Sequence, residues 1–386
     1  MVNDAGPAFT PLSAAETAPG ALGMWLAEMG LPGAECVRQA IRGYADGTLS
    51  YPVGFDFATD SLRRWLRHRH RWSVGADQVH WYSGAVHAIA ATVLATTDPG
   101  DTVVVMTPAY PPMLRAVGEL GRRLVRWPLG PDGQVDAAAL ARLVELRRPP
   151  LVVLTSPHNP TGRVFSGAEL RAVAEVVRAG SAFVLSDEVF ADVVFTGSRH
   201  TPFAAACPET ADRVVSVVSA SKAFNLAGLR CAAAVAGAEA AQRLATVAPA
   251  LTGTTSVVAA LAASAAWDHG EPWLTETLRQ LSANRERLFT ALGTEIPLLA
   301  GTPPEGTYLA WLAAAGPLAA TGDVQAALVD AGVDLAGGQP FGGSPARVRM
   351  CFACAPEVLE TAISRLSRVN AAALRAGRSR TSATSG

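Results

Sequence analysis

The chain has 386 residues, 49% of them hydrophobic, and a formal net charge of −1. This length suits one large domain and a smaller one, whereas the balanced charge argues against nucleic acid or an anionic membrane surface as a partner. No apolar run is long enough to cross a membrane, and the N-terminus lacks the basic and apolar regions of a secretion signal, so we expect a cytoplasmic protein.

Residues 1–20 are rich in Ala, Pro, Thr and Ser, and we expect a flexible tail there. An amphipathic helix should follow over residues 33–46. A second helix, over residues 61–72, carries many Arg and His residues and taken alone could bind nucleic acid. Trp65 and Trp72 give it an apolar side, and the chain is nearly neutral overall, so we favour a solvated helix face.

A turn between a short strand, residues 78–82, and an apolar helix that ends near residue 96 carries Gly84, Ala85 and Val86. Small residues at such a turn let backbone N–H groups approach a phosphate, and the helix dipole adds to the attraction. Many strand-to-helix turns share this pattern, so it indicates a phosphate site only together with other motifs.

Strand, helix and turn patterns alternate from about residue 75 to 235, which predicts a doubly wound α/β domain with its site at the carboxyl ends of the strands. Residues 150–155 form a wholly apolar strand, as expected inside a parallel sheet. Asp187 lies at the carboxyl end of another apolar strand. An acid at that place indicates a functional role. No GxGxxG or GxxxxGK(S/T) motif is present, so nicotinamide and Walker-type nucleotide binding are disfavoured.

Lys222 is the only lysine in the chain. Arginine can replace a surface lysine at little cost, but it stays protonated and cannot bond covalently to an aldehyde, whereas lysine can. We therefore interpret Lys222 as a catalytic residue. Ser219, Ser221 and Arg230 lie close to it in sequence, and a phosphate dianion is well matched by a fixed bidentate cation and short neutral donors.

The five cysteines are scattered, which does not favour a disulfide framework. Cys351 and Cys354 have CxxC spacing, but no second pair or nearby histidine completes a zinc site. They also lie in the apolar, strand-like run 348–353. We expect ordinary buried thiols and no bound metal.

Several motifs occur in an order that is shared with one enzyme superfamily. Segment 219–230 has the pattern Ser-x-Ser-Lys followed by Gly and Arg, and segment 156–165 contains Asn-Pro-Thr-Gly. Together with the rest of residues 21–370 they resemble the fold-type I pyridoxal-phosphate (PLP) enzymes, the aspartate aminotransferase superfamily. The stretches Met24-Trp25-Leu26-Ala27-Glu28-Met29, Pro157-His158-Asn159-Pro160 and Gly306-Thr307-Tyr308-Leu309-Ala310-Trp311 are similar to its MalY/PatB cystathionine β-lyase (C–S lyase) branch.

The resemblance implies a PLP-dependent transferase-like fold, with a large doubly wound, mostly parallel seven-stranded sheet domain and a smaller α/β domain. We expect the large domain over residues 46–275 and the small domain over 21–45 with 276–372. Residues 373–386 are expected to form a disordered C-terminal tail. The resemblance also implies a homodimer in which Tyr51 reaches the PLP phosphate of the partner.

It further implies how the cofactor is held. Lys222 binds PLP covalently and, once released, acts as the general base. The phosphate is held by the residues of the turn and of the lysine motif: Gly84, Ala85, Val86, Ser219, Ser221 and Arg230. Tyr110 stacks on the pyridine ring, Asn159 donates to its 3′-oxygen, and Asp187 pairs with the pyridine nitrogen; the bond Asn159–Pro160 is cis.

For the substrate, the resemblance implies that Arg349 clamps the α-carboxylate, with Arg347 as the second choice, and that Trp25 lies in the substrate site. Two positions depart from the pattern. Many aminotransferases have a tyrosine and many C–S lyases a histidine where this chain has Phe190, which cannot form a hydrogen bond to the 3′-oxygen. The lyase branch usually has Asp in place of Glu28.

Our first hypothesis is a β-eliminating C–S lyase that acts on cystathionine or an S-substituted L-cysteine and releases a thiol, pyruvate and ammonia. The alternative is a PLP-dependent aminotransferase or a specialised decarboxylating or oxidatively deaminating relative, because the same residues suffice for either. A binding or regulatory protein without catalysis is a third possibility, and the retained lysine argues against it.

Overall fold

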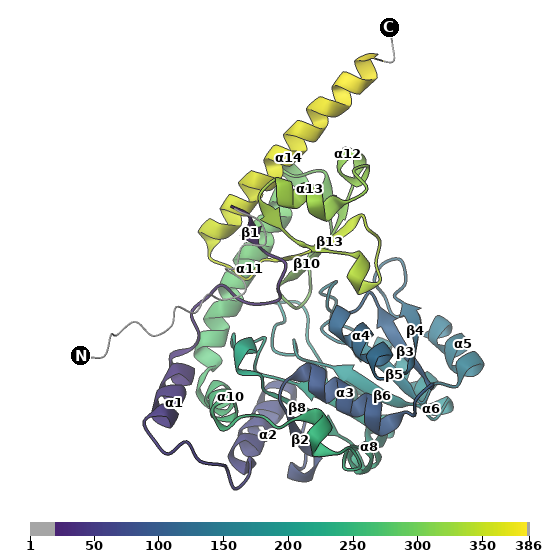
Figure 1. The fold of residues 1–386 in the computed structure, drawn as a ribbon, viewed down its shortest axis with the longest axis vertical. Helices are drawn as coiled ribbons and strands as arrows, with labels where there is room; N and C mark the ends of the chain where they lie inside the picture. Colours follow the sequence, from purple (N-terminus) through teal and green to yellow (C-terminus); the bar gives the residue numbers. More distant parts are fainter. Residues whose placement is uncertain (1–19, 384–386) are drawn as a thin grey trace. The chain divides into compact units, whose positions relative to one another are not determined.

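The computed structural model describes residues 20–383, with the backbone alone for residue 249 and residues 370–383 (Figure 1). The chain divides into two compact units. The larger contains Pro32–Ser282 and Pro304–Thr307, and the smaller contains residues 20–31, 283–303 and 308–383. No helix in this described part of the chain is long and apolar enough to cross a membrane.

The larger unit is built on a sheet of seven strands in the order β2-β8-β7-β6-β5-β3-β4. The strands are β2 (Val79–Tyr82), β3 (Thr102–Thr107), β4 (Arg123–Pro128), β5 (Leu151–Thr155), β6 (Phe183–Asp187), β7 (Val214–Val218) and β8 (Ala232–Ala236). Only β8 runs antiparallel to its neighbours, so the other six strands end at one edge. This confirms the predicted mostly parallel, seven-stranded sheet.

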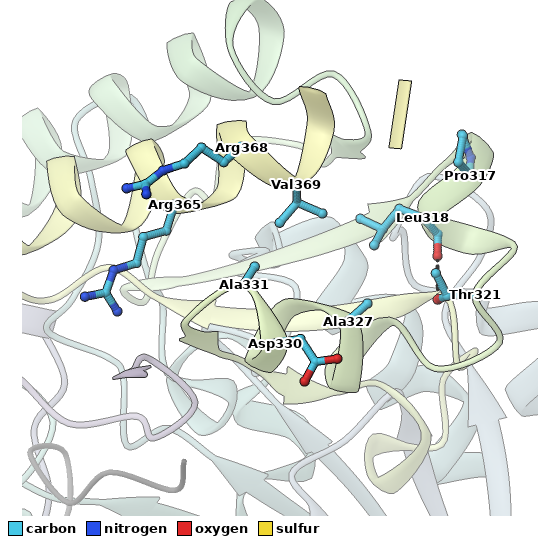
Figure 2. A pocket seen from close by; sticks show the side chains of 9 residues that line it. All are labelled: Pro317, Leu318, Thr321, Ala327, Asp330, Ala331, Arg365, Arg368 and Val369. Atoms are coloured by element: carbon cyan, nitrogen blue, oxygen red, sulfur yellow. Dashed lines mark hydrogen bonds between the residues drawn. The ribbon is translucent and has the colours of Figure 1, made fainter. Parts of the chain in front are cut away.

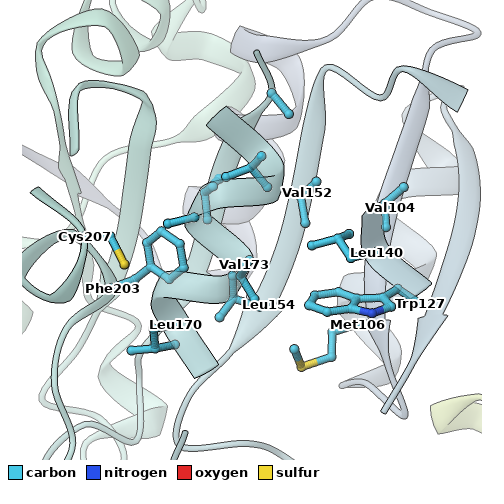
Figure 3. Close-up of a cluster of buried hydrophobic side chains, with 14 of the residues drawn as sticks. Val104, Met106, Trp127, Leu140, Val152, Leu154, Leu170, Val173, Phe203 and Cys207 are labelled. Carbon is cyan, nitrogen blue, oxygen red and sulfur yellow. The ribbon is translucent and has the colours of Figure 1, made fainter. Parts of the chain in front are cut away.

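The helices of the larger unit either pack on the sheet or pack on other helices, and the last of them extends past Ser282 into residues of the smaller unit. They are α1 (Glu35–Ala45), α2 (Asp56–His70), α3 (Ala85–Thr96), α4 (Pro111–Glu119), α5 (Ala137–Arg147), α6 (Gly167–Ala179), α7 (Phe203–Ala206), α8 (Ala238–Leu244), α9 (Pro249–Thr252), α10 (Val257–His269) and α11 (Glu271–Thr294). Side chains of α5, α6 and α7 form a core with alternate residues of β3, β5 and β6 (Figure 3). The intervening residues point to the other face, where α3 packs against β6, β7 and β8.

The smaller unit holds a sheet in the order β12-β13-β10-β9 and a parallel pair, β1 with β11. Its elements are β1 (Leu22–Gly23), β9 (Leu299–Ala300), β10 (Leu309–Ala314), α12 (Gly316–Ala319), α13 (Val324–Asp330), β11 (Val333–Asp334), β12 (Ala336–Gly337), β13 (Arg347–Cys351) and α14 (Pro356–Ala383). Cys351 and Cys354 are free thiols, and burial raises the pKa of Cys354 to about 12, which suits a structural role.

Several expected boundaries differ from the structure. Residues 276–282 and 304–307, which we expected in the small domain, belong to the larger unit. Residues 32–45 belong to the larger unit instead of the small domain, because α1 packs against α10. Residues 373–383 continue α14, where we expected a disordered tail; alanine and arginine, which are frequent there, are among the strongest helix formers. The expected tail over residues 1–20 lies outside the described residues except for Gly20, as do residues 384–386.

Candidate active site

The predicted cofactor residues of the larger unit follow five strands that run in the same direction. Gly84 follows β2, Tyr110 follows β3, Asn159 follows β5, Asp187 ends β6, and the lysine motif follows β7. Because the carboxyl ends of parallel strands meet at one edge of a sheet, these residues come from distant parts of the sequence to the same edge.

The turn at Gly84 brings the start of α3 close to the guanidinium of Arg230. Gly84 has φ +117° and precedes the first residue of α3, and a Cβ atom there would lie 3.0 Å from Nη2 of Arg230. Only glycine therefore lets the guanidinium lie against the start of this helix. A helix N-terminus and an arginine are both positive, so their close approach favours a bound dianion between them.

The two serines of the lysine motif differ in their contacts. The Ser219 hydroxyl lies 2.6 Å from the carbonyl oxygen of Cys231, which cannot donate, so Ser219 donates its single proton there. Ser219 Oγ also accepts from the backbone N–H of Ser221 at 3.0 Å and lies 2.9 Å from its hydroxyl. Ser221 is thus better suited to donate to a phosphate, and the predicted phosphate contact of Ser219 stays a prediction.

Asp187 is a buried acid with a raised pKa. It is 5% exposed, and its Oδ1 accepts a hydrogen bond of 3.3 Å from the N–H of Val189. Burial raises the pKa of Asp187 to about 6, and the charge of Glu188 raises it further, whereas the Val189 N–H and the charge of Lys222 lower it. At neutral pH the carboxylate is ionised and suited to hold a protonated ring nitrogen.

The loop that carries Asn159 is held firmly in place. The N–H of His158 donates to the carbonyl of Arg163, and the N–H of Gly162 donates to the carbonyl of His158, both at 2.7 Å. Arg163 binds Glu305 at 2.7 Å. The peptide bond Asn159–Pro160 is cis, as the resemblance implied. Burial lowers the pKa of His158 to about 3, so this histidine is neutral.

Tyr110 is the predicted stacking residue, and Phe190 stands where the resemblance implies a tyrosine or a histidine. Tyr110 is partly buried and forms the N-cap position of α4, while Phe190 is 1% exposed. Tyr110 stays the predicted stacking residue. A phenyl ring contributes apolar contact only, so the hydrogen bond to the 3′-oxygen is left to Asn159 in our prediction.

Arg349 and Trp25 lie next to each other in the smaller unit. Arg349 on β13 is 4% exposed, and its Nη2 donates to the carbonyl oxygen of Trp25 at 2.6 Å. Its guanidinium carbon lies 4.8 Å from the centre of the Phe341 ring. These contacts fix the direction of the arginine. Arg347 is more exposed, and the substrate-binding roles of Arg349 and Trp25 stay predictions.

The smaller unit also contains a pocket of about 450 Å³ between α12, α13 and α14 (Figure 2). Leu318, Ala327 and Val369 are among its apolar lining residues, and Asp330 and Arg368 are among its polar ones. None of the predicted site residues contributes to it, so we do not assign the reaction to this pocket.

Sequence reasoning missed a group of buried titratable residues next to Asp187. They are Glu188, Asp192, His70 and His200, and they form hydrogen-bonded pairs. Glu188 directly after Asp187 was the one available signal, because an acid next to an apolar strand is rarely left without a partner. Its histidine partner lies twelve residues further along the chain, in a stretch without regular periodicity.

Comparison with known proteins agrees with this geometry. Residues 34–366 match the family of class I and II aminotransferases. The chain is 33% identical over 370 residues to a putative cystathionine β-lyase of Mycobacterium leprae, covering 90% of this chain and 91% of that protein. It is 36% identical over 266 residues to a probable N-succinyldiaminopimelate aminotransferase of Mycobacterium tuberculosis, covering 65% and 64%.

A solved structure is also similar. The PLP-bound C–S lyase of Staphylococcus hominis matches with a TM-score of 0.86 and 27% sequence identity, covering 91% of this chain and 93% of that one. Fold and site together define a fold-type I enzyme with PLP as its cofactor. The chain belongs to the class I and II aminotransferase family. When bound, PLP supplies an electron sink for negative charge at the α-carbon of an amino acid.

Proposed function

We propose that this protein is a β-eliminating C–S lyase that acts on cystathionine or an S-substituted L-cysteine. Similarity to a putative cystathionine β-lyase over 90% of the chain is the observation that carries the proposal. The site residues support it: a sole lysine follows β7, an arginine lies against the start of α3, and a buried acid ends β6.

Each residue has a role in this reaction. Arg349, held by the carbonyl of Trp25 and the Phe341 ring, binds the α-carboxylate of the substrate through paired hydrogen bonds. Lys222 removes the proton from the α-carbon, a step that general-base catalysis accelerates by about 10²–10⁴-fold. The bond between the β-carbon and sulfur then breaks, and the thiolate leaves with the electron pair. Hydrolysis of the remaining enamine gives pyruvate and ammonia.

A homodimer is part of the proposal. Tyr51 lies between α1 and α2 and is 100% exposed, and the neighbouring Leu49 and Val53 are exposed as well. Three large apolar or aromatic side chains on one short exposed segment favour burial against another protein surface. We propose that a second copy covers this segment and that Tyr51 donates to the cofactor phosphate of that copy.

An aminotransferase is the second candidate, and the 36% identity to a probable N-succinyldiaminopimelate aminotransferase favours it. The two reactions share the removal of the α-proton and diverge afterwards. A transferase would keep the amino group of the substrate and release the keto acid, whereas a lyase would release the β-substituent.

One experiment separates the candidates. The purified enzyme is mixed with L-cystathionine or S-methyl-L-cysteine while pyruvate and the absorption between 300 and 500 nm are followed together. The lyase gives pyruvate in many turnovers with the original band retained. Conversion of the cofactor to its amine form without pyruvate would instead establish a transferase. L-2-aminobutyrate is the control substrate, because it has no leaving group at the β-carbon and its transamination gives 2-oxobutyrate instead of pyruvate.

A further inference from the structure

The segment that follows β6 is anchored at both ends by buried acids. Glu188 is 1% exposed, and Asp192, His70 and His200 are also buried. Ionised groups are costly to bury unless they are paired, so these contacts need an explanation beyond filling the core. The reactions considered above make no use of these four residues.

Glu188 connects the end of β6 to β7 and α7. Its backbone N–H donates to the carbonyl of Val217 at 2.9 Å. Its Oε1 accepts from the hydroxyl of Ser216 at 2.9 Å and from the N–H of Phe203 at 3.0 Å, and its Oε2 lies 3.2 Å from Nε2 of His200. Burial raises the pKa of Glu188, but hydrogen bonds, led by that from His200, outweigh it and hold the pKa below its ordinary value.

Asp192 connects the same segment to α2. Its carboxylate lies 2.7 Å from Nε2 of His70 and accepts from Nε1 of Trp65 at 3.0 Å. The rings of His70 and His200 meet edge to face with their centres 5.5 Å apart. One continuous set of contacts therefore runs from α2 through residues 188–192 to β7.

Asp187, at the start of this segment, is the last residue of β6, and its backbone is paired with β5 and β7. Its carbonyl accepts from the N–H of Ser156 at 3.0 Å. Its Oδ1 takes a hydrogen bond of 3.3 Å from the N–H of Val189 inside the segment. The direction of its carboxylate thus depends on the backbone of residues 187–189. Strand pairing fixes this backbone at residue 187, and the contacts of Glu188 fix it after the strand ends. The charges that act on Asp187 are those of Glu188 and Lys222, and those that act on Asp192 are those of His70 and Arg69.

We infer that Glu188, supported by His200, is a positioning residue that holds Asp187 toward the pyridine nitrogen of the cofactor and supplies a fixed negative charge beside it. His200 Nδ1 is buried and makes no hydrogen bond in the described structure. The hydrogen bond from Nε2 of His200 helps to hold the pKa of Glu188 below its ordinary value, so Glu188 keeps its charge. This inference holds for a lyase and for an aminotransferase alike.

The test compares cofactor retention in three variants of the full-length holoenzyme. Glu188→Gln removes the charge and keeps the shape, and His200→Gln removes one anchor and keeps the charge. Asp268→Asn is the matched control, because this acid binds Ser61 and Arg64 of α2 but is not connected to Asp187. Each protein is diluted at pH 4 to 8, and bound PLP is read from its absorption between 300 and 500 nm.

In both Glu188→Gln and His200→Gln, the dissociation constant of PLP at pH 7.5 should be about 3–10-fold higher than in the parent. This is the effect expected for one weakened charged hydrogen bond. Retention in the parent should fall toward acid pH, where Asp187 takes up a proton, and we call the midpoint of this fall the break. Because a protonated ring nitrogen beside Asp187 lowers the pKa of this acid, the break lies below the value of about 6 that burial gives it in the cofactor-free protein. In Glu188→Gln this break should move down by roughly half a pH unit or more, because a neighbouring negative charge is gone. The break should stay in place in His200→Gln and in the control.

Retention within twofold of the parent in both variants at pH 7.5 would overturn the inference, as would an unmoved break in Glu188→Gln. A purely structural role lowers the thermal midpoint without moving the break, so the pH profile distinguishes the two. If Glu188→Gln does not fold, His200→Gln decides the anchoring: retention equal to that of Asp268→Asn would then reject it.

Discussion

The interior of the seven-stranded sheet and its carboxyl edge bury different kinds of side chains. Between β3, β5 and β6 and the helices α5 to α7, the core consists of Val, Leu, Phe, Trp and other apolar residues (Figure 3). At the carboxyl edge, Asp187, Glu188, His158 and Ser219 are buried as well. The interior stabilises the fold, whereas the edge gives up stability to hold charges where the chemistry needs them. Four substitutions test this contrast.

The largest effect is expected for Lys222→Ala. Activity should fall by at least about 10²–10⁴-fold, because the general base is removed, and the absorption band of the lysine-bound cofactor should be lost. Unfolding by urea should change little, since this partly buried side chain is not part of the core. Lys222→Arg keeps the charge and should be equally inactive; an active arginine variant would contradict the assignment.

A substitution in the interior should lower the stability of the fold and leave the cofactor site unchanged. Leu154→Ala removes a fully buried side chain of the core cluster and should lower the free energy of unfolding by about 2–5 kcal/mol. The absorption spectrum of the remaining folded enzyme should stay that of the parent. Leu146→Ala, at a position that is 71% exposed, is the control and should cost less than about 0.5 kcal/mol.

Asp187→Asn should stabilise the cofactor-free protein at neutral pH. Burial raises the pKa of Asp187 to about 6, so the folded protein binds this proton more tightly than the unfolded chain does. The free energy of unfolding of the parent therefore falls as the pH rises through that value. The free energy of unfolding of the variant should therefore exceed that of the parent at pH 7.5, by up to roughly 3 kcal/mol. This difference should vanish near pH 4. Urea unfolding across this range measures it. An equal difference at both pH values would argue against a buried, titrating carboxyl.

The smallest effect is expected at Gly84, where a second glycine variant separates the cost of a positive φ from the effect of the nearby Arg230 guanidinium. Gly84→Ala and Gly100→Ala both place alanine at positive φ and should each cost about 1–2 kcal/mol of stability. Only at Gly84 would the new Cβ lie 3.0 Å from the guanidinium, whereas nothing lies within 4 Å at Gly100. PLP affinity should fall in the first variant alone. Equal affinity in both would contradict a phosphate site at this turn.

The mostly parallel sheet, the order of its elements and the cis bond at Asn159–Pro160 could be predicted because they leave local or motif-sized signals in the chain. Apolar runs such as residues 150–155 belong to strands buried on both faces, and a sole lysine among arginines indicates chemistry that needs an amine. The limits of the units could not be predicted, since the packing of α1 against α10 joins residues more than 200 positions apart.

The sequence by itself determined the class of enzyme, the cofactor and the strand ends at which the site residues lie, because each depends on residue type and local order. The tertiary structure alone decided that Arg230 lies against Gly84, that Ser219 donates to Cys231, and that Glu188 is bound by His200. Such pairings are long-range or stereochemically specific, and the free energy that selects them comes from burying polar groups together, for which a linear pattern carries no signal.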